Sequence, residues 1–167
     1  ANGVMPLVFV STRGLDAATN YAQNFDYTGT QRQPFDPSKP NPNMWVWEPN
    51  PAQQGQFRAR QLTFQLNMER WPSFMNDGRL IFSSVKRAPG FYQIALRRQN
   101  IDGGDYHPLY SQRASLGLHE ATQVVELANK NFATILSNQG WQHQGGVLGV
   151  FNRSLGIDFY STDKNDY

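Results

Sequence analysis

RWPSFMNDGRLIFSS, residues 70–84, is the stretch that decides the fold. An aromatic-Pro-Ser lead-in is followed by Asn-Asp-Gly and then by a run of Leu, Ile and Phe. Asp and Gly readily adopt the backbone conformations of a tight hairpin turn, and apolar residues on both sides of such a turn are typical of paired strands. We expect a strand, a turn and a second strand here, and the fold depends on whether this unit recurs.

Short apolar runs of the same kind occur along most of the chain. They are rich in Val, Ile, Phe and Tyr and are bounded by Gly, Pro and Asn, which is the pattern of β-strands. The sequence therefore predicts a nearly all-β protein. Strands are expected at Met5–Thr12, Asn43–Pro49, Phe57–Phe64, Pro72–Met75, Arg79–Val85, Phe91–Arg98, Tyr106–Ser111, Thr122–Leu127, Phe132–Ser137 and Gly146–Asn152.

Two segments need a separate interpretation. HEATQVVELANKNFA, residues 119–133, has residues that a helix tolerates, but its adjacent Val residues and its Ala-Asn-Lys-Asn cluster favour a strand followed by a hairpin turn. Residues 14–42 show neither the helical nor the strand period. We interpret them as a long surface insertion, a kind of loop that is often functional.

The unit does recur. RLIFSS matches FATILS with an offset of 52 residues when Phe132 is set against Leu80 (132 − 80), while RQLT matches HPLY with an offset of 47 (107 − 60). The order of parts is the same in each case: an inner strand, a tight turn, a second strand, a third strand, a second turn and a short outer strand. Four strands in about 40 to 50 residues are the signature of a β-propeller blade.

The residues of these units resemble the blade repeat of TolB-like β-propellers. RARQLTF (58–64) followed by ERWPSFMNDGRLIFSS (69–84) is similar to the outer strand, inner strand, Asp-Gly turn and second strand of that repeat. MPLVFVSTRG (5–14) resembles the second strand of a preceding blade, and YQIALRRQNIDGGDYHPL (92–109) resembles a third and fourth strand. Asn76 stands where the family usually has Pro, and residues 128–131 lack the Asp-Gly pair.

The resemblance implies a chain of about two and two-thirds four-stranded blades. A propeller ring usually has about four to eight blades, so this number cannot close one. We therefore expect the chain to be part of a larger ring, completed by further blades on the same chain or on another. The expected divisions are a first blade at 5–64 with the insertion at 14–42, a second blade at 70–111, a partial third blade at 120–152 and a tail or linker at 153–167.

Composition excludes several function classes. The 15 basic and 13 acidic residues give a formal charge of +2 and are well mixed, so no basic stripe for nucleic acid is visible. The absence of Cys removes disulfides and thiolate metal sites but does not identify the compartment. No apolar run approaches the roughly 18 residues of a membrane span. The resemblance alone implies a periplasmic or extracellular location.

No catalytic motif is visible, and we expect no cofactor or metal in this chain. The three His residues, at 107, 119 and 143, have no metal-binding interval between them, and no Ser lies in a Gly-x-Ser-x-Gly motif. Asp102–Asp105 resembles a calcium loop superficially but lacks the alternating carboxylates and the distal Glu, so we interpret it as a hairpin turn. Trp45 and Trp47 are expected to pack on one face of a strand.

Two function classes remain. The first is a non-catalytic scaffold that binds a protein partner, and the second is a propeller domain of a larger enzyme, either a peptidase gating domain or part of a redox complex. GWQHQGG, residues 140–146, could stack a sugar or a base, or cover the edge of a blade. The candidate binding residues are Glu69, Arg70, Lys86, Arg87, His119 and Glu120 on the loop face, with Trp141 and His143 in the glycine-rich loop.

Overall fold

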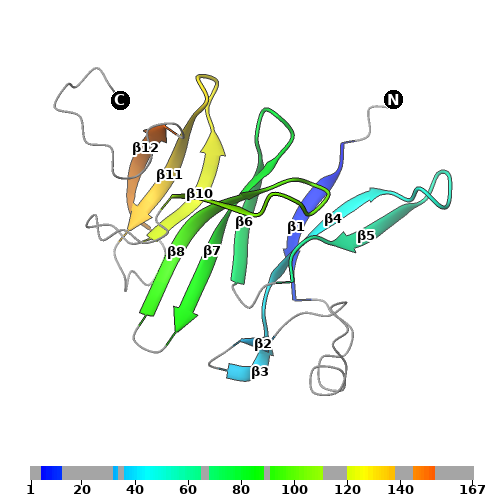
Figure 1. The fold of residues 1–167 in the computed structure, drawn as a ribbon, viewed down its shortest axis with the longest axis horizontal. Helices are drawn as coiled ribbons and strands as arrows, with labels where there is room; N and C mark the ends of the chain where they lie inside the picture. Colours follow the sequence, from blue (N-terminus) through cyan, green and yellow to red (C-terminus); the bar gives the residue numbers. More distant parts are fainter. Residues whose placement is uncertain are drawn as a thin grey trace. The chain divides into compact units, whose positions relative to one another are not determined.

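The computed structural model describes residues 5–12, 32–33, 36–64, 68–88, 91–110, 120–137 and 145–152. These residues form twelve strands and no helix, so the all-β prediction is confirmed (Figure 1). In this part of the chain there is accordingly no helix long and apolar enough to cross a membrane. The chain divides into two compact units, Ala1–Arg70 and Trp71–Tyr167.

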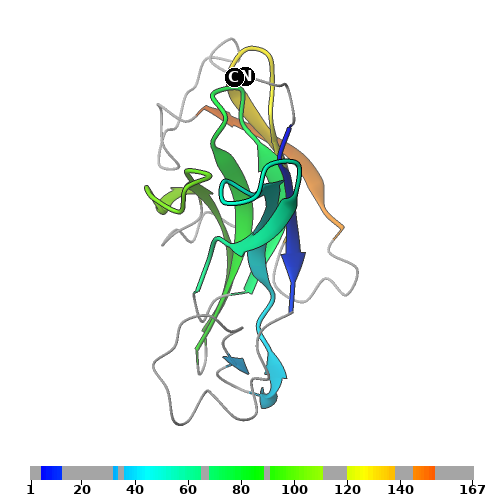
Figure 2. The same ribbon diagram turned by 90° about the vertical axis from the view of Figure 1, so that its right-hand side faces the viewer.

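The first unit contains a three-stranded antiparallel sheet in the order β1 (Leu7–Ser11), β4 (Asn43–Pro49), β5 (Phe57–Gln61). β1 and β4 lie side by side in both views (Figure 1, Figure 2). Leu7 lies opposite Trp47, which in turn lies opposite Ala59. This row places apolar side chains of all three strands on one face of the sheet.

A second, two-stranded sheet lies inside the expected insertion. It pairs β2 (Arg32–Gln33) with β3 (Asp36–Pro40) in antiparallel orientation. The sequence showed no strand period here, so these two strands were not among those expected. The sequence did not indicate a strand here because β3 contains Pro37 and Pro40, and Pro has no backbone N–H to donate to a neighbouring strand. Both strands of a two-stranded ribbon are edges, where that loss is tolerated.

The second unit holds two runs of consecutive strands. In the first run, β7 (Leu80–Ala88) lies between β6 (Met68–Phe74), which starts at the end of the first unit, and β8 (Phe91–Gln99), and β8 also pairs with β9 (His107–Tyr110). The second run pairs β10 (Glu120–Glu126), β11 (Asn131–Ser137) and β12 (Val147–Asn152) in order. A single parallel pair, Glu120 with Ile94, links the two runs.

All ten strands expected from the sequence overlap a strand of the structure. Asn43–Pro49 matches in both bounds, and the hairpin interpretation of residues 119–133 is confirmed by β10 and β11. The largest shift is in β6, which begins at Met68 and not at the expected Pro72. The short apolar run after Pro72 revealed only the second half of this strand.

Three tight turns of the second unit share one hydrogen-bond pattern. Between β6 and β7, the Gly78 amide donates to the Met75 carbonyl (2.9 Å), and the Met75 amide donates to the Arg79 carbonyl (2.7 Å). Equivalent pairs of bonds close the other two turns. They join Gly103 to Asn100 (3.0 Å) and Asn100 to Gly104 (2.8 Å), and Lys130 to Leu127 (2.9 Å) and Leu127 to Asn131 (2.7 Å).

Side chains reinforce the same three turns. Asp77, Asp102 and Asn129 each accept a hydrogen bond from the backbone amide two residues further on, at 3.1, 2.8 and 3.1 Å. Lys130 takes the place of Gly78, with φ values of 66° and 83° respectively. The segment without an Asp-Gly pair therefore forms the same turn, because Asn129 replaces the Asp and Lys130 adopts the left-handed conformation.

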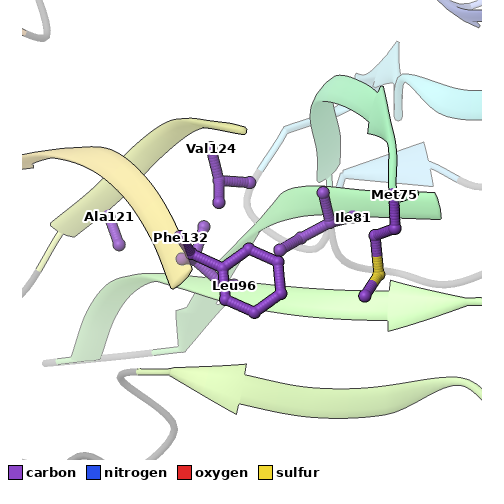
Figure 3. Close-up of a cluster of buried hydrophobic side chains, with 6 residues drawn as sticks. All are labelled: Met75, Ile81, Leu96, Ala121, Val124 and Phe132. Carbon is purple, nitrogen blue, oxygen red and sulfur yellow. The ribbon is translucent and has the colours of Figure 1, made fainter. Parts of the chain in front are cut away.

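The core of the second unit lies where the two runs of strands pack face to face. Ile81 of β7 and Leu96 of β8 meet Phe132 of β11, and all three side chains are fully buried. Figure 3 shows the cluster gathered between the β7–β8 and β10–β11 ribbons. Burial of large apolar side chains contributes roughly 1.5–3 kcal/mol each, so this contact is a main source of the unit's stability. The remaining members are Met75, Ala121 and Val124.

Candidate functional site

Glu69, a predicted loop-face residue, is a fully buried carboxylate in the first unit. It accepts hydrogen bonds from Asn43 Nδ2 (3.1 Å) and Thr63 Oγ1 (3.2 Å). The Thr63 hydroxyl also accepts a bond from the Met44 amide (2.9 Å). Glu69 therefore fixes the start of β4, the segment after β5 and the start of β6 in place, as a buried charge with several donors can.

Gln61 extends this buried network. Its Nε2 donates to the Thr63 carbonyl (2.8 Å) and to Asn43 Oδ1 (3.5 Å). Sequence reasoning did not select Asn43 or Thr63. The Leu-Thr pair at 62–63 belongs to the segment that resembles the outer strand of the repeat. In the structure it lies just after β5, and nothing in this short sequence shows that Thr63 faces the carboxylate of Glu69.

Glu120 is a second buried carboxylate, in the second unit. It is the first residue of β10 and is 3% exposed, and the Ser137 hydroxyl donates a 2.7 Å hydrogen bond to its Oε2. The bond crosses from β11 to β10 at the end of the pair, where Glu120 lies opposite Ser137. Glu69 and Glu120 thus both stand near the start of a strand and are both held by a hydroxyl.

The structure brings three of the predicted positions to one end of the sheet in the second unit. Ile94 of β8 lies opposite Val85 of β7 and is paired on its other side with Glu120. The next two positions of β7 are Lys86 and Arg87, so two cationic residues lie near the end of this strand, within two register positions of the buried carboxylate. The end of β7 and the start of β8 lie toward the lower left in Figure 1.

The other predicted residues lie in the first unit or outside the residues that the structure describes. Arg70 is half-buried on β6 at the end of the first unit. His119, Trp141 and His143 lie outside the residues that the structure describes. Partner contact by any of these eight residues stays a prediction.

A charged network that sequence reasoning missed lies near the turns at the other end of the same strands. Arg79 donates to Asp77 through Nε (2.8 Å) and lies 3.7 Å from Asp105, which also pairs with Arg98 (3.4 Å) and with His107 Nδ1 (3.3 Å). The hydrogen bond to Asp77 raises the pKa of Arg79, against the opposing effect of burial. Asp77 and Asp105 each lie beside glycine in a predicted turn. The sequence did not show the contact between Arg79 and Asp105, because it joins two different hairpins.

The polar side chains at these positions connect neighbouring strands through hydrogen bonds and ion pairs. Among the described residues no group of His, Asp and Glu could hold a metal ion. Each buried carboxylate has a hydroxyl donor at hydrogen-bond distance, and the half-buried side chains of Arg79 and Arg98 pair with Asp105. Such networks position strands and shape a charged surface.

The comparisons with known proteins concern the fold. No family model matches the chain, and no curated protein matches it in sequence. A solved structure titled Kuenenia stuttgartiensis hydrazine synthase is similar, with a TM-score of 0.58 and 16% sequence identity. The match covers 71% of this chain but only 18% of that one, so this chain matches less than a fifth of its length. At this identity the likeness shows the fold alone.

Proposed function

We propose that this chain is a non-catalytic scaffold of β-propeller blades that binds a protein partner through the sheet end carrying Lys86, Arg87 and Glu120. The observation that carries the proposal is the meeting of these residues at one end of neighbouring strands. The resemblance to TolB-like repeats supports the blade assignment, and so do the face-to-face packing of the two runs and their 52-residue offset. A periplasmic or extracellular location is part of the same proposal.

The partner that suits this end carries acidic groups. Two consecutive cations lie near the end of β7, while the Glu120 carboxylate is buried and held by Ser137. Complementary charge on a partner would speed association and discriminate among partners more than it would add affinity. Binding should therefore weaken as the salt concentration rises.

The test is affinity capture from the source cells with three baits: the wild-type chain, Arg87→Glu and Lys130→Glu. Lys130 is the control because it is an exposed cation in the turn between β10 and β11, away from the starts of β8 and β10. A protein retained by wild type and by Lys130→Glu but lost with Arg87→Glu supports the proposal. Equal recovery by all three folded baits would show that this end does not bind it.

A second candidate is a propeller domain of a larger enzyme whose active site lies outside this chain. The specific observation that favours it is the likeness to hydrazine synthase, an enzyme chain of which this one matches only 18%. The intact mass of the native particle separates the two candidates. A particle that also contains catalytic polypeptide favours the enzyme, whereas a particle of this chain with a non-catalytic partner favours the scaffold.

A further inference from the structure

One face of the β1–β4–β5 sheet exposes large apolar side chains. Leu7 and Trp47 lie opposite each other and are 62% and 45% exposed, and Met5, two residues before Leu7, is 83% exposed. The rings of Trp47 and Phe57 stack with their centroids 6.0 Å apart and 4° between their planes. Contiguous apolar surface of this kind is uncommon on a protein that has no partner there.

The two faces of this sheet differ sharply. Met44 and Val46, which alternate with the tryptophans along β4, are fully buried. On the apolar face, the indole Nε1 of Trp45 is buried and has no hydrogen-bond partner. That atom is covered by the chain itself, so what this face offers a partner is its exposed apolar side chains, Leu7, Trp47 and Phe57.

The second unit exposes a complementary face on β10–β12. Val125, Ala133 and Val150 form one cross-strand row, in which the two Val side chains are each 46% exposed. Leu148, two residues before Val150 on the same face, is 72% exposed. The opposite face of β12 carries Phe151, which packs against Phe132 with ring centroids 5.2 Å apart.

The 52-residue offset identifies what covers such a face elsewhere in this molecule. Leu148 corresponds to Leu96 (96 + 52), and Ala133 corresponds to Ile81 (81 + 52). Ile81 and Leu96 are fully buried beneath the next sheet of the same repeat. The exposed face of β10–β12 is thus the equivalent of a face that the earlier strands bury against a following sheet.

We propose that the Leu148–Val150 face of one copy of this chain packs against the Trp47–Phe57 face of a second copy, head to tail. Each copy presents both faces, so the contact is heterologous: one surface of each copy meets a different surface of the next. The contact buries aliphatic side chains against the stacked aromatic pair, which is a favourable combination.

The test is the mass of the purified full chain in solution at concentrations from about 1 to about 100 μM, measured by light scattering and native mass spectrometry. We expect wild type to form dimers or larger species whose share rises with concentration. Trp47→Glu and Leu148→Glu should each be monomeric over the same range, while an equimolar mixture of the two should form a heterodimer, because one intact contact remains. Ala52→Glu, in an exposed turn, is the matched control and should associate like wild type.

Each further outcome decides against the proposal. A monomeric wild type, variants that associate like wild type, or a mixture that stays monomeric would each overturn it, as would a native particle in which a different polypeptide covers either face. Thermal melts check that the variants fold. If Trp47→Glu does not fold, Leu7→Glu tests the same face at a more exposed position.

Discussion

Trp71 on β6 and Gln123 on β10 lie 52 residues apart (123 − 71) and share a left-handed backbone conformation, with φ values of 51° and 53°. The pairing of β10 with β11 shifts register between Thr122 and Val125, the interval that contains Gln123. A left-handed conformation at a residue other than Gly costs on the order of 1–3 kcal/mol, so its recurrence at the same offset is not accidental. The two runs of strands are therefore two copies of one structural unit, down to a strained position inside the first strand of each.

Replacing Lys130 by Gly should stabilise the protein. Lys130 holds φ at 66° in the turn where the equivalent residue is Gly78. Gly adopts this conformation without steric cost, but it also has more backbone entropy in the unfolded chain. The net increase in the free energy of unfolding should be about 0.5–1 kcal/mol. Denaturant unfolding measures the change. Lys130→Ala removes the same side chain but keeps the strain and should give no gain, so equal stabilisation by both variants would contradict the argument.

Replacing Gly78 by Val should destabilise the protein by about 1–3 kcal/mol. Gly78 has φ of 83°, and a Cβ placed there meets no atom within 4 Å, so the cost comes from the backbone conformation and not from a clash. The melting temperature should fall by several degrees. An unchanged melting temperature would mean that the turn can take another shape.

Replacing Ser137 by Ala should cost about 1–3 kcal/mol, because the buried Glu120 carboxylate loses its 2.7 Å hydrogen bond. Ser83→Ala is the matched control. The Ser83 hydroxyl is equally buried but donates to a neutral acceptor, the Ala121 carbonyl (3.0 Å), and should cost about 1 kcal/mol. Urea denaturation of both variants compares them, and an equal or larger loss with Ser83→Ala would contradict the role assigned to Glu120.

Glu48 should make stability depend on pH in the acid range. Two hydrogen bonds from Arg60 (2.8 and 2.9 Å), supported by Arg58, lower the pKa of the Glu48 carboxyl from 4.5 to about 2. Because the folded pKa is the lower one, this stabilisation is complete above pH 4.5 and is lost as the pH falls toward 2. Solvent screens these side chains, which limits the contribution to about 0.5–1 kcal/mol.

Glu48→Gln provides the measurement. The variant should be less stable than wild type at pH 6 by about 0.5–1 kcal/mol, and the difference should shrink toward zero near pH 2, where wild type has lost its carboxylate. Chemical denaturation at both pH values gives the two differences. A gap of the same size at pH 2 and pH 6 would show that the ion pairs do not carry the effect.

The strands and turns could be predicted because the signals that specify them are local. Asn43–Pro49 was expected in both bounds from one run of aromatic and apolar residues, and the 52-residue offset was visible in two six-residue segments. The β2–β3 ribbon was missed, since its Pro-rich sequence has no strand period. The turn at 127–131 lacks the Asp-Gly pair, so the sequence did not show that it matches the other turns. Only the backbone shows that Lys130 adopts the left-handed conformation that Gly78 has in the equivalent turn.

The candidate site could be predicted only as a set of positions. Lys86, Arg87 and Glu120 were chosen from the order of strands and loops, and the register does bring their strands together. Nothing in the sequence showed that Glu69 and Glu120 would be buried and held by Thr63 and Ser137. Burial of a charged side chain depends on donors supplied by other strands, and a single strand does not specify them.

By itself, the sequence determined the β-strands, their tight turns and their repetition, because period-two patterning and turn residues act over a few positions. Only the tertiary structure decided which face of each strand is covered. Ile81 and Leu96 are buried while their counterparts Ala133 and Leu148 are less covered, and Trp47 is exposed although its strand alternates like the others. A strand has two faces, and which one is removed from water depends on the sheet that packs against it, not on its own residues.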